Sequence, residues 1–442
     1  MTLIKDITIV TMNPDREIIT NGAIRIEGSK IVAIDKSENF PESPASINGG
    51  GMVALPGLID THAHADQSLL RGLGDQMHWV PFLDKIVDPY LSERSIHHSV
   101  LANQLSMIEM IKGGTTCFLS PNADPTDDFN LLSEASSNIG IRAIFCRFTT
   151  AKEKTRAWVN NLNDLNQRNN KLVDVWVGLD IPRVQGDTAH PDFYRDVRHV
   201  CERLGTGLAY HFCSEFEDSV YMYNEFGKTA AEWSRDNGIL GPNVVLINGC
   251  QLTAGDIEIL NETGTHLSHS PVANMKMATG ILPASDVLHA GVNLALGTDG
   301  ALNNNTYDMF AEMKAACLLQ NSSKRSARAL RPEHALEMAT VNGAKAVGKT
   351  DLGSIEVGKE ADIILVDMMN PRTRPQHDVA SNLVFSASAS QVRHVFVAGK
   401  HVLNNYQLEG VSELEIMRKV DSAADEIREI AAETNTPLWP MR

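Results

Sequence analysis

The feature that most constrains the fold is a regular alternation of short apolar strands and helical stretches from about residue 57 to residue 347. Helical spacing of apolar residues is seen in Ser95–Lys112, Phe193–Leu204 and Asp256–Thr263. Strands are expected at residues 58–62, 115–120, 142–147, 173–180, 207–213, 244–250, 265–270 and 293–298. Eight strands that alternate with helices predict an α/β fold, a distorted (β/α)8 TIM-like barrel.

Both ends of the chain have a different, β-like texture. Residues 4–11 and 23–34 alternate apolar and polar side chains, and residues 361–366 and 392–399 do so again after the barrel segment. Strands from distant parts of a chain can pair in one sheet, which keeps the termini together. We therefore predict two domains, a barrel over residues 57–353 and a small composite β-sandwich domain. The composite domain comprises residues 1–56 and 354–442 and includes a solvent-facing helix over Ser412–Thr434.

Composition and charge narrow the range of partners. The formal net charge is −16, whereas binding to nucleic acid phosphates or anionic membranes normally requires clustered Lys and Arg side chains. No apolar run reaches the length of about 18 residues that crosses a bilayer, and the N-terminus lacks a signal-peptide pattern. The six cysteines have no disulfide or metal-site spacing. We expect a cytoplasmic protein that acts on a small molecule and binds neither nucleic acid nor membrane.

The strongest local motif is the pair of histidines in His62-Ala63-His64, which follows the apolar segment Gly57–Thr61. Residues two apart in a strand point to the same face, so both imidazoles can reach one ion. His211 and Asp299 also stand at the ends of predicted strands, where the active sites of β/α barrels are built. These four residues predict a divalent metal site that activates water. Asp299 serves as a ligand, as the base that takes the water proton, or as both in sequence.

The order of the motifs resembles the amidohydrolase superfamily. The resemblance rests on Pro56–His64, His211, Ser268–Asn274, Gly297–Gly300 and the tail Gly353–Val366, and it covers almost the whole chain. The chain is most similar to the branch that contains chlorotriazine hydrolases, guanine deaminase and adenosylhomocysteine-type deaminases. The resemblance implies one divalent ion, with zinc favoured over iron(II), and a homodimer or higher homo-oligomer. No Lys follows the fourth strand to bridge two metals, which favours a mononuclear site.

The acid-base residues of this branch are replaced in the chain. Its deaminases carry a Glu three residues after the fifth-strand His and a His at the end of the sixth strand, where this chain has Ser214 and Asn248. Neither side chain can take over proton transfer alone. One hypothesis is that Glu215, or else Glu217, carries protons instead; the alternative is that both face solvent. A second hypothesis is a urea, carbamate or amide substrate whose carbonyl oxygen is stabilised by Asn248.

Five further residues lie close to the predicted strand ends. His269 follows the seventh strand, and the resemblance places it in the pocket lining; alternatively it is a buried structural His. Arg71 and Trp79 lie in the loop where relatives close over the substrate, and Trp79 either stacks on a flat ring or anchors the core. Cys213 and Cys250 flank the altered positions. They are either thiolate ligands or, in the interpretation that we favour, small buried side chains.

Taken together, the sequence predicts a hydrolase that cleaves a non-peptide C–N bond, or a C–Cl bond, of a small, cyclic or heteroaromatic substrate by metal-bound hydroxide. The predicted ligands are His62, His64, His211 and Asp299; the predicted catalytic residues are Asp299, Glu215, Asn248 and Ser214; and the predicted substrate-binding residues are His269, Trp79 and Arg71. The urea, carbamate or amide hydrolase is the alternative. A non-catalytic metal-binding relative is the third possibility.

Overall fold

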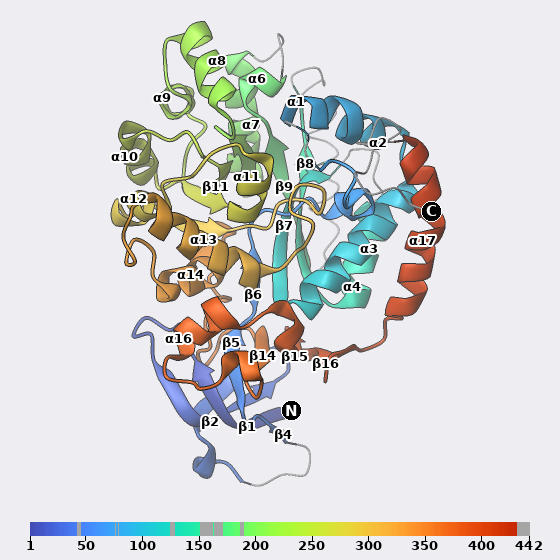
Figure 1. Cartoon of the computed structure of the whole chain (residues 1–442), viewed down its shortest axis with the longest axis vertical. Coiled ribbons are helices and arrows are strands. Elements are labelled where there is room, and N and C mark those ends of the chain that lie inside the picture. Colours follow the sequence, from blue (N-terminus) through green and yellow to red (C-terminus); the bar gives the residue numbers. More distant parts are fainter. Residues whose placement is uncertain are drawn as a thin grey trace.

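Two sheets organise the molecule, a barrel sheet of eight strands and a second sheet of nine strands at one end of it (Figure 1). A computed structural model describes residues 1–41, 46–75, 77, 79–123, 129–150, 162, 171–185 and 190–430. Within those residues no helix is both long and apolar enough to cross a membrane.

All eight predicted barrel strands are present and pair in parallel in chain order. They are β6 (Leu58–Asp60), β7 (Thr115–Ala123), β8 (Arg142–Phe148), β9 (Val173–Leu179), β10 (Leu208–Phe212), β11 (Val244–Asn248), β12 (His266–His269) and β13 (Leu294–Leu296). The first and last strands meet where the Thr61 amide donates to the Leu296 carbonyl at 3.0 Å and the Asp299 amide donates to the His62 carbonyl at 2.7 Å. The prediction of a TIM-like barrel is therefore confirmed.

The barrel strands are buried on both faces, as parallel strands between helices must be. Alternate residues of the strands, among them Ile59, Leu119 and Val245, form one cluster inside the barrel. The intervening residues, such as Phe118 and Tyr210, belong to a second cluster beneath the outer helices. Because the side chains of a strand alternate between its two faces, one set fills the barrel interior and the other packs against the surrounding helices.

Helices follow the strands and coat the barrel. They are η2 (Ala65–Leu70), α1 (Trp79–Phe82), η3 (Leu83–Val87), α2 (Asp88–Glu93), α3 (Ile96–Lys112), α4 (Phe129–Ile139), α6 (Pro182–Gln185), α7 (Pro191–Leu204), α8 (Phe216–Phe226), α9 (Ala230–Asp236), α10 (Ala254–Thr263), α11 (Pro271–Met277), α12 (Ala284–His289), α13 (Met309–Ser323), α14 (Pro332–Ala339) and α15 (Val341–Ala346). The predicted helix at Ser95 begins as expected, because the Ser95 hydroxyl accepts the His98 amide at 3.2 Å as an N-cap.

The second sheet is built from both ends of the chain, as predicted, and is one mixed sheet of nine strands. Its strands are β1 (Thr2–Val10), β2 (Ile18–Glu27), β3 (Lys30–Lys36), β4 (Ile47–Asn48), β5 (Met52–Pro56), β14 (Ile363–Asp367), β15 (Val392–Val397), β16 (Lys400–Asn404) and β17 (Gln407–Leu408). The two ends join where β5 pairs antiparallel with β14. Short helices η1 (Ser37–Asn39), η4 (Pro371–Thr373), α16 (Val379–Ser381), η5 (Asn382–Ser386) and η6 (Ala389–Gln391) complete the connections.

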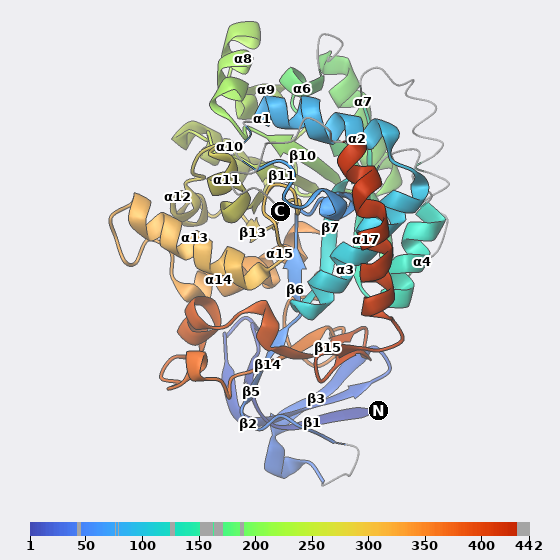
Figure 2. The ribbon, with the colours of Figure 1, turned by 45° about the vertical axis from the view of Figure 1, so that its right-hand side comes forward.

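The predicted C-terminal helix is present as α17 (Glu413–Ile430) and is mostly exposed, but it packs on the barrel, whereas the prediction placed it with the small domain. It lies along α3 and α2 of the barrel in both views (Figures 1 and 2). Ile416, Ala423 and Ile427 are buried, and Glu413 pairs with the Lys112 ammonium at 2.7 Å. The buried apolar residues form a narrow stripe on one face of the helix. The stripe is hard to recognise in a segment whose other residues are mostly polar.

Candidate metal centre and active site

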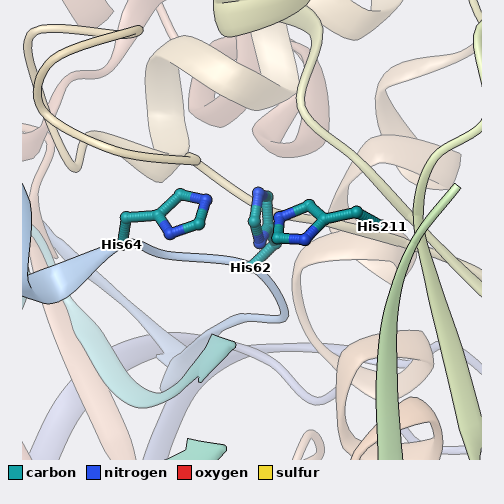
Figure 3. A group of neighbouring side chains, drawn as sticks. All are labelled: His62, His64 and His211. Atoms are coloured by element: carbon teal, nitrogen blue, oxygen red, sulfur yellow. The ribbon is translucent and has the colours of Figure 1, made fainter. Parts of the chain in front are cut away.

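Three histidines converge at the end of the barrel where the strands finish. His62 and His64 follow β6, and His211 on β10 approaches them from the other side (Figure 3). Their ring centroids are 4.8 to 5.3 Å apart, and one ligand atom from each lies within 4.8 Å of the others. All three side chains are buried. The predicted histidine ligands are thus brought together.

Asp299 completes the group as the fourth predicted ligand. Its Oδ1 atom lies 3.2 Å from Nε2 of His62 and 3.4 Å from Nε2 of His64. Two donors about 2.1 Å from a tetrahedral ion are roughly 3.4 Å apart, so these spacings fit a shared metal. The same oxygen accepts the Gly300 amide at 2.8 Å and the Asn303 side-chain amide at 2.9 Å. These two donors fix the carboxylate's direction.

Asp60 fastens together the two chain segments that carry the ligands. Its Oδ1 atom accepts the amides of His62 at 3.1 Å and Thr298 at 3.0 Å, and its Oδ2 atom accepts the Thr298 hydroxyl. Burial raises the pKa of Asp60 to about 7, although the hydrogen bonds from Thr298 and His62 oppose the rise. On the other side of the motif, the Tyr307 hydroxyl donates to the His64 carbonyl at 2.7 Å. The backbone at both ligands is therefore held rigidly.

The environment favours the metal-binding protonation states of His62, His64 and Asp299, whereas it favours the charged form of His211. Burial lowers the pKa of His62 and, more strongly, that of His64, so both rings stay neutral. Burial alone would raise the pKa of Asp299, but the three neighbouring imidazoles outweigh it and hold that pKa below its ordinary value. Burial also acts to lower the pKa of His211, yet Asp180 at its Nδ1 outweighs this, and the pKa is raised. Neutral imidazoles and an ionised carboxylate are the forms that bind a divalent ion.

Unsatisfied nitrogens indicate that these residues fit a metal. Within the described part of the chain, Nε2 of His62 and Nε2 of His211 are buried without a hydrogen-bond partner. Burying such atoms unpaired costs free energy that coordination would offset. Three imidazoles and one carboxylate are a donor set suited to zinc, iron(II) and similar ions, and they leave a position for water. The set therefore fits one divalent ion.

The two altered acid-base positions are joined to each other. The Asn248 amide donates to the Ser214 hydroxyl oxygen at 2.9 Å, and the Asn274 amide donates to the Asn248 carbonyl oxygen at 2.9 Å. All three side chains are buried. A neutral hydrogen-bonded chain, Ser214–Asn248–Asn274, thus stands where the family has its titrating pair.

Three residues at the ends of barrel strands adopt left-handed backbone angles without being glycine. The φ angles are 46° at Cys213, 75° at Asn248 and 65° at Asp299. Such conformations are costly and cluster at functional sites, although Asn and Asp tolerate them better than other residues. Ten other described non-glycine residues also have positive φ angles, so these three support the assignment of the site only together with the convergence of the histidines.

Glu215 is buried, so the alternative that both candidate carboxylates face solvent is wrong for Glu215 and correct for Glu217. The Glu215 carboxylate lies 3.2 Å from the Arg183 guanidinium, which also pairs with Asp218 at 2.5 Å. Glu215 therefore points at least partly toward α6, and its role as a proton carrier stays a prediction.

The remaining predicted residues have varied surroundings. His269 is fully buried at the end of β12, where burial lowers its pKa to about 3. Arg71 pairs with Glu109 on α3, and Trp79 begins α1, its side chain lying outside the described residues. Burial raises the pKa of the Cys250 thiol to about 12, and that of Cys213 is raised as well. Protonated thiols are poor ligands, which supports the interpretation of both as packing residues.

Sequence reasoning missed two residues of the site. Asp180 follows β9, and its Oδ1 atom lies 2.7 Å from Nδ1 of His211. Asn303 donates to the ligand carboxylate of Asp299. The position of Asp180 at the end of the fourth strand was the signal that could have found it, whereas Asn303 lies in a loop and carries none.

Comparisons with known proteins agree with this geometry. A 5'-deoxyadenosine deaminase from Methanosarcina acetivorans is 35% identical over 96% of this chain and 98% of its own. A 5-methylthioadenosine/S-adenosylhomocysteine deaminase from Thermoanaerobacter pseudethanolicus is 31% identical over 96% and 98%. The crystal structure of a zinc-bound adenosine deaminase from Xanthomonas campestris superposes with a TM-score of 0.90 at 26% identity, covering 97% of this chain and 98% of its own.

A second solved structure has the same fold at lower identity. It is a mutant atrazine chlorohydrolase from Arthrobacter aurescens complexed with zinc and atraton, with a TM-score of 0.89, 20% identity and coverage of 96% and 100%. A model of the amidohydrolase family matches residues 53–402, a span that contains all four metal-site residues and strands of both sheets. The chain belongs to the amidohydrolase family.

Proposed function

We propose that the protein is a metal-dependent hydrolase that releases an amine, or chloride, from a small, cyclic or heteroaromatic molecule. The observation that carries the proposal is the buried group of three histidines and Asp299 at the open end of the barrel. The names of the relatives, which are deaminases, support a C–N bond as the target. A divalent ion, zinc in preference to iron(II), would be held by His62, His64, His211 and Asp299.

Bound there, the ion would lower the pKa of a water molecule toward neutrality. Asp299 is the residue placed to take the proton of the attacking water, because its carboxylate stays ionised and its Oδ1 faces the histidines. The donors from Gly300 and Asn303 hold that oxygen in place while it does so. Asp299 can then return the proton to the departing nitrogen, so one carboxylate serves both halves of the reaction.

The neutral chain Ser214–Asn248–Asn274 supports a role in orientation. A hydroxyl and an amide can hold a ring nitrogen or a carbonyl oxygen of the substrate but cannot deliver a proton to it. We propose that Ser214 and Asn248 orient the substrate and that Glu215 is the candidate for a second proton carrier. In a urea, carbamate or amide hydrolase, the second candidate function, the Asn248 amide would instead stabilise the developing oxyanion.

A substrate panel tests the choice between these functions. The zinc-loaded protein is assayed for ammonia release from adenosine nucleosides and guanine, for chloride release from chlorotriazines, and for amine release from aryl ureas and carbamates. Ammonia or chloride release that disappears in Asp299→Asn would support the proposed function. Amine release from ureas alone would replace it with the second candidate. No turnover by a protein that binds zinc stoichiometrically would favour a non-catalytic relative.

A separate variant tests the proton-carrier role of Glu215. If Glu215 carries a proton, Glu215→Gln should lower kcat by about 10²-fold or more, the contribution typical of general acid–base catalysis. Glu217→Gln is the matched control, since Glu217 is exposed and lies only two residues further along the chain. Near-full turnover in Glu215→Gln would remove Glu215 from the mechanism.

A further inference from the structure

Asp180 and His211 stand side by side at the ends of neighbouring strands. β9 and β10 pair in parallel, with Tyr210 opposite Leu179, so the next residues along each strand are His211 and Asp180. The Asp180 backbone is fixed by the Tyr194 hydroxyl, which donates to its carbonyl at 2.9 Å. The Asp180 side chain is mostly buried, and its Oδ1 atom lies 2.7 Å from Nδ1 of His211. The contact therefore follows from strand register and does not depend on a flexible loop.

We propose that Asp180 is a positioning residue that holds His211 in the orientation and tautomer required to bind the metal. A neutral imidazole carries one N–H, and whichever nitrogen bears it cannot coordinate. A carboxylate at Nδ1 keeps the proton there and leaves the lone pair of Nε2 for the ion. Both ring nitrogens of His211 are buried without a partner that meets hydrogen-bond geometry among the described residues, but Nδ1 lies beside the Asp180 carboxylate, so Nε2 is the nitrogen left for the ion.

His211 differs from the other two histidines in having a carboxylate beside Nδ1. Among the described residues, the carboxylate contacts of His62 and His64 are those of Nε2 with Asp299. Those two residues are held through their backbone, by Asp60 and Tyr307. His211 lies on the strand opposite, where the Asp180 carboxylate and the Leu179 backbone contact its ring. Loss of the Asp180 carboxylate should therefore disturb His211 directly and leave the supports of His62 and His64 in place.

Asp180 itself is not placed as a ligand. Its Oδ1 atom contacts Nδ1 of His211, and the residues whose ligand atoms converge in the described chain are His62, His64 and His211, without Asp180. The carboxylate adds a negative charge beside the site and makes the His211 nitrogen a better donor. The proposal rests on the metal site of the proposed function but not on any choice of substrate.

Metal binding to the full chain tests the inference directly. Zinc is removed by a chelator, and the affinity for cobalt(II) and zinc is measured by competition, together with the visible absorption spectrum of the cobalt(II) form. Asp180→Asn should weaken metal binding by about 10- to 100-fold, the usual cost of losing such a partner. The cobalt spectrum should also change, because His211 would no longer be fixed. Asp180→Glu, which keeps a carboxylate, should recover part of the affinity.

Asp174→Asn is the matched control, since Asp174 lies on the same strand β9 but pairs with Lys349 at the opposite end. It should bind metal as the unaltered protein does. Wild-type affinity and an unchanged cobalt spectrum in Asp180→Asn would overturn the proposal, and so would a loss confined to kcat with a shifted pH profile, which would make Asp180 a proton carrier. If His62→Ala also left metal affinity unchanged, the metal site itself would fail, and with it the proposed function.

Discussion

Replacing Gly297 by alanine should damage the metal site by steric pressure alone. Gly297 follows β13 and packs against the segment that bears the first ligand. A methyl group at this position would lie 2.6 Å from Cβ of His62, 2.9 Å from its amide nitrogen and 2.8 Å from the Ser268 hydroxyl oxygen. The backbone of Gly297 is not in the left-handed region, so alanine is conformationally allowed and the contacts are the sole penalty.

The size of the effect follows from these distances. Carbon atoms pack best at about 3.5–4.0 Å, so His62 must move by about 1 Å to admit the methyl group. Overpacking of this kind costs about 1–3 kcal/mol, whereas metal ligands must sit within about 0.2 Å of their ideal distances. Zinc binding would require His62 to return to its original position, in contact with the new methyl group. If the overpacking energy is lost from binding, zinc affinity should fall by about 5- to 150-fold.

Chelator competition for zinc measures the loss, with circular dichroism to check that the chain is folded. Gly255→Ala is the control, because its methyl group would meet only the Thr253 hydroxyl at 3.9 Å, within helix α10. That variant should bind zinc normally. A folded Gly297→Ala protein with unaltered zinc affinity would refute the packing of the two ligand segments described above.

Three further outcomes are expected. Burial lowers the folded-state pKa of His269 to about 3 from an unfolded value of 6.5, so its contribution to stability is complete above pH 6.5 and is lost as pH falls toward 3. Between pH 8 and pH 5 the metal-free protein should lose about 2 kcal/mol more stability than His269→Gln does, because the other buried histidines titrate in both proteins, and an equal loss in the two would contradict the assignment. Arg142→Met should lower the free energy of unfolding by about 3–5 kcal/mol, because it leaves the buried Asp362 carboxylate, 2.9 Å from the guanidinium, without its charged partner. Arg331→Met, which removes the exposed pair with Glu333, should cost at most about 1 kcal/mol when both variants are compared by urea unfolding. Chelation should abolish turnover and remove about 4 kcal/mol of stability relative to zinc at 1,000 times its dissociation constant, and a chelated protein that kept its unfolding midpoint would show that the ion is not bound to the folded state.

The sequence predicted the barrel, and it singled out four residues that the structure brings together, because both depend on local pattern. Each of the eight strands is a short apolar run, and the ligands come at or just after strand ends, where parallel strands place their last side chains at one rim. His62 and His64 follow β6, which ends at Asp60, so their convergence depends on the chain after the strand and not on strand alternation. A composite sheet from the two chain ends was likewise foreseeable from the return of alternating patterns after the barrel.

Contacts between segments were less accessible from sequence. Asp180 meets His211 only because β9 and β10 pair in a particular register, which no single strand encodes. Glu215 comes after its strand has ended, so alternation could not tell whether it faced solvent or Arg183. The helix α17 was misjudged because three buried residues in a polar segment give a weak signal, and the surface they cover belongs to a distant helix.

The composite sheet determines the order in which the molecule can form. β5 becomes an interior strand only when β14 pairs with it, and every barrel strand is synthesised between the two. During translation, β1, β2, β3 and β5 must therefore wait with an unpaired edge while the barrel emerges, and such edges invite association with other chains. Closing so long a loop is slow. Completion of the sheet is thus a late event on the ribosome, and the strands most exposed to misassembly are those of the composite sheet.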